Sequence, residues 1–84
     1  MSDVTVYSTR LCPYCFQARR LLRRHGVEWE EHRLSRRSRE RLAELSQGGR
    51  TFPQVLIDGR SVGGFAELRG LDRDGTLRQM LGRA

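Results

Sequence analysis

The sequence of 84 residues predicts a small α/β fold, a four-stranded mixed sheet flanked by helices in the order β-α-β-α-β-β-α. At the amino end, a short alternating apolar run is followed by a helical pattern that stops at a glycine. A second strand-like run comes next, which is typical of a βαβ unit with two parallel, right-handed strands. Later, an Asp-Gly pair separates two more strand-like runs and indicates a hairpin.

The first βαβ unit covers residues 4–33. The alternating run Val4-Thr5-Val6-Tyr7 predicts the first strand, since it is rich in β-branched and aromatic residues. A helix from Pro13 to about His25 follows, with Gly26 as its stop, and one face carries Ala18, Leu21 and Leu22. The run Val27 to Arg33, centred on Trp29, is predicted as the second strand.

The second helix is predicted from about Arg36 or Ser38 to Ser46. Ser35 is the expected cap at its amino end, and Gly48-Gly49 ends it. Leu42 and Leu45 are expected to face inward.

The remaining elements follow from turn signals. Pro53 to Ile57 is predicted as a buried strand, and Asp58-Gly59 as a two-residue turn to a strand at Arg60-Ser61-Val62. Gly63-Gly64 then opens a third helix that runs through Leu68. The Asp74-Gly75 turn precedes a short amphipathic segment that ends near Leu81, and with no linker or repeat the chain is predicted to be one domain, 1–84.

The charge is strongly basic. The net charge is +6, and all sixteen basic residues are arginines, nine of them between Arg19 and Arg41. A nucleic-acid surface is one alternative, but no aromatic residues are interleaved with this charge. Several of these arginines fall opposite a leucine face, which favours a solvated helix surface: Arg19, Arg20, Arg23 and Arg24. A basic domain should nevertheless attract anionic substrates and acidic partner proteins.

No apolar run is long enough to cross a membrane, and no signal peptide precedes Val4. We therefore expect a cytoplasmic protein without a membrane partner. In a reducing compartment, a cysteine pair is more often catalytic than structural.

The two cysteines, Cys12 and Cys15, are the only ones in the chain. At positions i and i+3 of a first helical turn they face the same way, and Pro13 between them suits the first position of a helix. The helix N-terminus stabilises a thiolate on Cys12. Cys12 is thus the predicted nucleophile, and Cys15 can resolve the mixed disulfide that it forms.

Two other interpretations of the pair are open. A structural disulfide would close so short a loop that it constrains the unfolded chain little. A zinc site with His25 and His32 would have its histidines farther apart than the usual finger pattern. Redox chemistry is favoured over both, and no metal is expected.

With this element order, the chain resembles a dithiol glutaredoxin of the thioredoxin fold. Three segments carry the resemblance, which covers essentially the whole chain: Cys12-Pro13-Tyr14-Cys15, Thr51-Phe52-Pro53 and Gly63-Gly64-Phe65-Ala66-Glu67-Leu68. The resemblance implies a glutathione-dependent thiol–disulfide oxidoreductase that transfers electrons to protein disulfides and removes glutathione from proteins.

The resemblance also implies a glutathione site. A cis Pro53, following Thr51, would present the Phe52 backbone to the cysteinyl part of glutathione. The helix start at Gly64 and Phe65 would bind the γ-glutamyl carboxylate, and Glu67 its ammonium group. The ring of Tyr14 would flank the groove.

The chain departs from the family pattern beside the nucleophile. The family usually has a lysine three residues before the first cysteine, where this chain has Thr9, so Arg10 is predicted to supply the charge. Arg39, early in the second helix, is predicted to contact the glycyl carboxylate. Glu67 replaces the usual aspartate, and Phe65 stands where some relatives have a third cysteine.

The partners implied are glutathione and proteins with disulfides or glutathionylated cysteines, with ribonucleotide reductase as one candidate. A monomer without specific nucleic-acid binding is expected. One rival is an electron donor reduced by thioredoxin reductase, which Thr9 favours. Another is a dimer that binds an iron–sulfur cluster through Cys12, although Pro13, Tyr14 and Cys15 differ from the Cys-Gly-Phe-Ser motif of such carriers.

Overall fold

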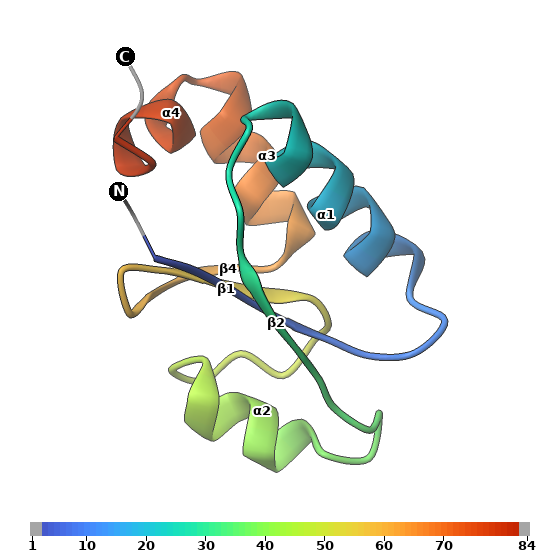
Figure 1. Ribbon diagram of the computed structural model, residues 1–84. Helices are drawn as coiled ribbons and strands as arrows, with labels where there is room; N and C mark the ends of the chain where they lie inside the picture. Colours follow the sequence, from blue (N-terminus) through green and yellow to red (C-terminus); the bar gives the residue numbers. More distant parts are fainter. Residues whose placement is uncertain (1–2, 83–84) are drawn as a thin grey trace.

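The computed structural model describes residues 3–82 and has eight helices and strands (Figure 1). In chain order these are β1 Val4–Ser8, α1 Pro13–Arg24, β2 Glu30–Arg33, α2 Arg39–Leu45, β3 Gln54–Ile57, β4 Arg60–Gly63, α3 Phe65–Arg73 and α4 Thr76–Met80. Met1 and Ser2, which bear on the predicted absence of a signal peptide, lie outside the described residues. No helix in the described part of the chain has the length and apolar character needed to cross a bilayer.

The four strands form one mixed sheet in the order β2-β1-β3-β4. β1 and β2 are parallel, with Thr5 opposite Glu30, as the predicted crossover through α1 requires. β3 runs antiparallel to β1, with Val6 opposite Val55, and pairs with β4 through the predicted hairpin. The carboxyl end of β1, which leads to the cysteines, therefore lies between β2 and β3.

Helices cover both faces of the sheet. α1, α3 and α4 lie on one face and α2 on the other (Figure 1). β3 is buried at all four positions because it is a central strand covered from both sides. The larger core lies under α1 and α3 and includes Val6, Leu22, Val55, Leu68 and Leu77, while Leu42 is fully buried on the α2 side.

Three predicted boundaries are wrong, and the first is the start of the second strand. The second strand begins at Glu30 and not at Val27, so Trp29 precedes it. The residues Val27 and Trp29 pack against the core from the connection after α1, and the Trp29 indole N–H donates to Glu31 at 3.1 Å. Their apolar character reflects this packing and not strand pairing.

The second helix begins at Arg39, so Ser35 is not its cap. Ser35 instead forms a separate turn, in which its hydroxyl accepts from the Arg37 N–H at 3.2 Å and its carbonyl from the Ser38 N–H at 2.9 Å. Local hydrogen bonding by a serine side chain competes with helix formation in this way. The third helix continues past Leu68 to Arg73.

The core should be sensitive to a single truncation. Leu22→Ala removes a fully buried side chain between α1 and the sheet, and we expect a loss of about 2 to 5 kcal/mol in the free energy of unfolding. Leu11→Ala, at a side chain that is 81% exposed, should change it by less than about 0.5 kcal/mol. Urea unfolding followed by circular dichroism measures both, and equal losses would contradict the assigned core.

Candidate active site around Cys12

Cys12 lies at the amino end of α1, at the N-cap position, and Pro13 is the first helical residue. The Cys15 backbone N–H donates a hydrogen bond to Cys12 Sγ at 3.2 Å. The sulfur thus takes the place that a serine or aspartate oxygen occupies in an ordinary cap. The free N–H groups and the dipole of the helix favour negative charge at this point.

The two cysteines have different environments, and both are free thiols. Cys12 is partly exposed and Cys15 is fully buried. Burial raises the pKa of Cys15 to about 12, helped by its hydrogen bond with the Cys12 side chain and opposed by a hydrogen bond with the Thr9 backbone. Cys15 is therefore protonated at neutral pH, and Cys12 is the thiol that can react.

The loop before β3 lies against Cys12. The Phe52–Pro53 peptide bond is cis, as predicted, and Pro53 is buried. The Cys12 thiol donates to the Phe52 carbonyl oxygen at 3.8 Å. This long sulfur contact brings the Cys-x-x-Cys turn and the Thr51-Phe52-Pro53 segment together, although they are 40 residues apart in the sequence.

The amino end of α3 packs against the loop before β3, next to Cys12. Gly64 is the N-cap of α3, and a Cβ atom there would be 3.3 Å from the Pro53 carbonyl oxygen and 3.8 Å from Thr51 Oγ1. Only glycine allows so close an approach without displacing the neighbouring backbone. The Glu67 carboxylate accepts from the Gly64 N–H at 3.5 Å, so it also caps the helix.

Two aromatic rings join the first turns of α1 and α3. Tyr14 stacks on Phe65, with ring centroids 6.0 Å apart and planes inclined by 28°. The seven predicted groove residues are therefore joined to Cys12 through Phe52, and to one another by these contacts: Tyr14 with Phe65, and Gly64 with Thr51, Pro53 and Glu67.

The two predicted arginines lie farther out. Arg39 donates to the Arg50 carbonyl oxygen at 3.0 Å, which places it at the edge of the segment that continues to Thr51. Arg10 is exposed and lines a pocket that also contains Cys12, but no hydrogen bond joins its guanidinium to the sulfur.

Sequence reasoning missed Arg36. Its guanidinium donates to the Arg10 carbonyl oxygen at 3.0 Å and to the Leu11 carbonyl oxygen at 2.8 Å. Leu11 has a φ of 57°, a left-handed conformation that non-glycine residues rarely adopt. Arg36 thus stabilises the turn that positions Cys12. No local sequence motif distinguishes it from the other arginines of its segment, which is why the sequence did not indicate this role.

Arg19 also differs from the prediction of a solvated surface. It forms a salt bridge with Glu31 at 3.0 Å, in which each side chain is 23% exposed. Burial alone would raise the pKa of Glu31, but hydrogen bonds from Trp29 and Ser8 and the charges of Arg19 and Arg33 together lower it. This carboxylate joins α1 to β1 and β2 beneath the active-site turn.

The zinc alternative is not supported by the arrangement of the side chains. His25 bonds to Asp72 at 2.5 Å and His32 to Glu30 at 2.8 Å. Within residues 3–82, no three side chains of the metal-binding types come together.

Comparison with known proteins gives a consistent result. The family model described as Glutaredoxin matches residues 4–62. The glutaredoxin of Pseudomonas aeruginosa is 40% identical over 83 residues, which cover 96% of this chain and 98% of that protein.

Solved structures agree as well. The holo form of glutaredoxin C1 from Populus tremula × tremuloides aligns with a TM-score of 0.83 at 26% identity, covering 95% of this chain and 83% of that one. A buckwheat glutaredoxin–glutathione complex aligns with a TM-score of 0.80 at 25% identity, covering 96% and 77%. The predicted fold is confirmed.

The asymmetry of the cysteines predicts selective alkylation. At pH 7, iodoacetamide should modify Cys12 and leave Cys15, because only a thiolate reacts and a thiol whose pKa is raised to about 12 stays protonated. Cys15→Ser should be labelled as fast as the unchanged protein, and Cys12→Ser at least about 100-fold more slowly. Mass spectrometry of the reduced protein over time measures this, and comparable labelling of both cysteines would contradict the assignment.

Proposed function

The chain belongs to the glutaredoxin family, and on that premise we propose that it reduces glutathione mixed disulfides and protein disulfides with Cys12 as nucleophile and Cys15 as resolving thiol. It is a glutathione-dependent thiol–disulfide oxidoreductase. The observation that carries the division of roles is the contrast between the two sulfurs. Cys12 Sγ is partly exposed and accepts a helix N–H, whereas Cys15 is buried and protonated.

In the monothiol route, the Cys12 thiolate attacks the glutathione sulfur of a mixed disulfide. The bond between that sulfur and the substrate sulfur breaks, and the substrate leaves as a thiolate that takes up a proton. A second glutathione thiolate then attacks the sulfur of the glutathione bound to Cys12. Oxidised glutathione leaves, and Cys12 returns as a thiolate without any metal or further cofactor.

In the dithiol route, the Cys12 thiolate attacks one sulfur of a protein disulfide, the bond between the two protein sulfurs breaks, and the other protein sulfur leaves as a thiolate. The Cys15 thiol gives its proton to that thiolate and attacks Cys12 Sγ, the bond from Cys12 to the protein breaks, and the protein leaves reduced while a Cys12–Cys15 disulfide remains. Two glutathione molecules reduce it. The burial of Cys15 supports this order, because a shielded thiol meets only the disulfide formed at its neighbour.

We assign glutathione to the groove between the two loops and α3. The Phe52 backbone, held by the turn at Thr51 and Pro53, would pair with its cysteinyl residue. The N–H of Phe65 and its neighbours at the start of α3 would bind the γ-glutamyl carboxylate, and Gly64 would let the backbone approach it closely. The ammonium group would meet Glu67, Tyr14 would cover the tripeptide, and Arg39 and Arg10 would face its glycyl carboxylate. The glutathione complex of the buckwheat glutaredoxin supports glutathione as the ligand.

The remaining expectations belong to the same proposal. The protein would act as a monomer in the cytoplasm and pass electrons to disulfide-containing proteins, with ribonucleotide reductase as one candidate. The scarcity of cysteine, with a single pair in the whole chain, supports a redox role in a reducing compartment.

A coupled assay tests the roles of the cysteines. With NADPH, glutathione reductase, glutathione and a small glutathione mixed disulfide, the unchanged protein should consume NADPH rapidly and Cys12→Ser should be inactive. Cys15→Ser should retain this activity and lose most of its reduction of a protein disulfide. Loss of both activities in Cys15→Ser would contradict the division of labour. An inactive unchanged protein would instead favour a donor reduced by thioredoxin reductase, consistent with Thr9 in place of the family lysine.

Glu67→Gln tests the groove. The amide can still cap α3 through Gly64 but cannot pair with an ammonium group, so we expect the KM for glutathione to rise about fivefold with little change in kcat. Steady-state kinetics at varied glutathione measure this. The matched control is Glu40→Gln, an exposed carboxylate in the first turn of α2, and an equal rise there would show a non-specific charge effect.

A further inference from the structure

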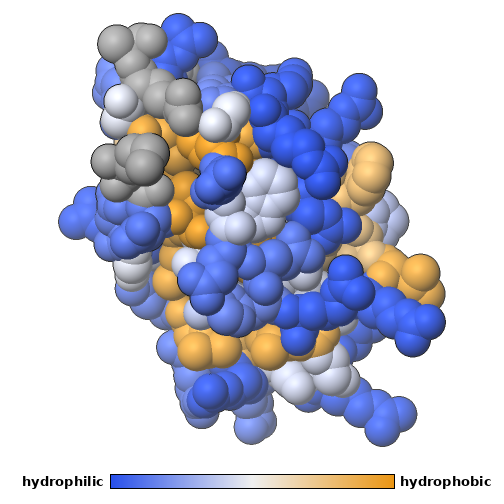
Figure 2. All heavy atoms as spheres, in the orientation of Figure 1, coloured by the Kyte–Doolittle hydropathy of each residue, from blue (hydrophilic) through white to orange (hydrophobic). Residues whose placement is uncertain are grey.

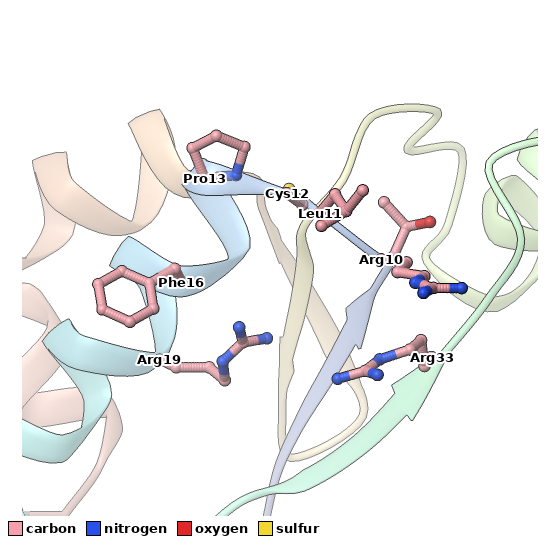
Figure 3. Close-up of a pocket in the computed structure, with 8 residues that line it drawn as sticks. Arg10, Leu11, Cys12, Pro13, Phe16, Arg19 and Arg33 are labelled. Carbon is pink, nitrogen blue, oxygen red and sulfur yellow. The ribbon is translucent and has the colours of Figure 1, made fainter.

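An open pocket of about 540 Å³ lies beside Cys12, between α1 and the end of β2 (Figure 3). Besides Cys12, the residues that matter for its chemistry are Arg10, Leu11, Phe16, Arg19 and Arg33. No lining residue comes from the Thr51–Pro53 loop or from α3. The pocket and the proposed glutathione groove therefore meet at Cys12 from different sides.

The pocket has an excess of positive charge. Arg10, Arg19 and Arg33 line the pocket, and in Figure 3 the side chains of Arg19 and Arg33 extend toward each other below Cys12. Arg19 is neutralised by its salt bridge with Glu31, and Arg33 acts on the same carboxylate through its charge. Arg10 has no acidic partner among residues 3–82. The pocket thus has three guanidinium groups and one nearby carboxylate, that of Glu31, which neutralises Arg19, so the site suits an additional anionic group.

The fold leaves large apolar side chains uncovered near Cys12, and two of them, Leu11 and Phe16, line the pocket. The exposed large apolar residues of the described chain all lie within four positions of Cys12: Leu11, Tyr14 and Phe16, which are 81%, 59% and 56% exposed. Figure 2 shows apolar spheres at the edge of the molecule where Figure 1 has the loop between β1 and α1, next to a mostly hydrophilic surface.

Leu11 is the most informative of these residues. Its left-handed backbone is unfavourable for leucine, and its side chain is exposed, so neither local conformation nor burial accounts for an apolar residue there. An apolar group exposed beside a reactive sulfur is typical of a docking surface.

We propose that this pocket binds the polypeptide that flanks the substrate cysteine, and that it prefers a flank with an apolar side chain next to a carboxylate. The inference rests on the proposed function, since it assigns the second half of the mixed disulfide that Cys12 attacks. With glutathione in the groove near Phe65, the polypeptide half, which is bonded to the glutathione sulfur beside Cys12, has to extend in another direction. The pocket offers Leu11 and Phe16 to its apolar side chain and Arg33 to its carboxylate.

The test compares two glutathionylated peptides with a single cysteine each, flanked by Leu and Glu in one and by Leu and Lys in the other. Reaction with Cys12 forms a bond to the glutathione sulfur, breaks the bond to the peptide sulfur and releases the peptide thiol. Its kcat/KM is measured at low salt by chromatography of the released peptide. The mixed disulfide of glutathione and 2-mercaptoethanol serves as a substrate without a polypeptide half.

We expect the unchanged protein to prefer the Glu peptide about fivefold or more. Arg33→Gln should lower that preference about threefold, the effect of one exposed charge pair. The matched control Arg60→Gln removes an equal charge at the β3–β4 hairpin, near the start of β1 and far from Cys12, and should keep the preference. Neither variant should change turnover of the 2-mercaptoethanol disulfide.

Leu11→Asn tests the apolar part separately. Asparagine tolerates the left-handed backbone, so the fold should be retained, and kcat/KM should fall about threefold for both peptides but not for the 2-mercaptoethanol disulfide.

Three results would overturn the docking site. These are equal preferences in the unchanged protein and Arg33→Gln, an equal loss in Arg60→Gln, or peptide rates unaffected by Leu11→Asn. If the unchanged protein fails to turn over even the 2-mercaptoethanol disulfide, the proposed function is wrong and the docking site falls with it.

Discussion

The first turn of α1 has to hold the sulfur of Cys12 while leaving it open to a substrate. Pro13 is the first residue of the helix, and the Cys15 N–H donates a hydrogen bond to Cys12 Sγ, so the sulfur caps the amino end of α1. The N–H groups of this first turn thus stabilise negative charge on the sulfur, and no side chain is needed as a general base. The rest of the site is built around this sulfur. Phe52, in the loop before β3, contacts it directly, and Gly64, at the start of α3, packs against the same loop at Pro53.

The same turn makes the two cysteines unequal. Three residues of helix carry the chain from the partly exposed N-cap to the fully buried inner face, so Cys15 loses contact with water and Cys12 does not. Burial, the largest contribution, keeps the Cys15 thiol protonated. Two identical side chains thereby take different roles, Cys12 as the nucleophile and Cys15 as the resolving thiol, because only Cys15 is packed against the sheet.

Four of the arginines have distinct positions around the active site, which the net charge of the chain does not reveal. Arg36 holds the carbonyl groups of the active-site turn, Arg19 neutralises the carboxylate beneath it, and Arg33 and Arg10 border the open pocket. These four come from α1, the end of β2 and two loops, and they gather at the carboxyl end of β1. The basic character of the chain is thus partly structural at this end of the sheet, and it gives the nucleophile an electropositive surrounding.

The cis proline was implied by the family resemblance, whereas the sequence by itself determined the order of the elements, the βαβ unit and hairpin, and the cysteine pair at a helix start. Each of these depends on neighbours in the chain: the spacing of apolar residues, turn residues and Pro13 in the motif. It misplaced the start of the second strand at Val27 and the second helix cap at Ser35, because Trp29 and Ser35 satisfy contacts that local patterns do not distinguish. Only the tertiary structure decided that Tyr14 stacks on Phe65, that Arg36 fastens the turn at Leu11, and that Arg19 is paired and not solvated. Such contacts join residues distant in sequence, and their partners are fixed by the packing of α1 and α3 on the sheet, which no local pattern encodes.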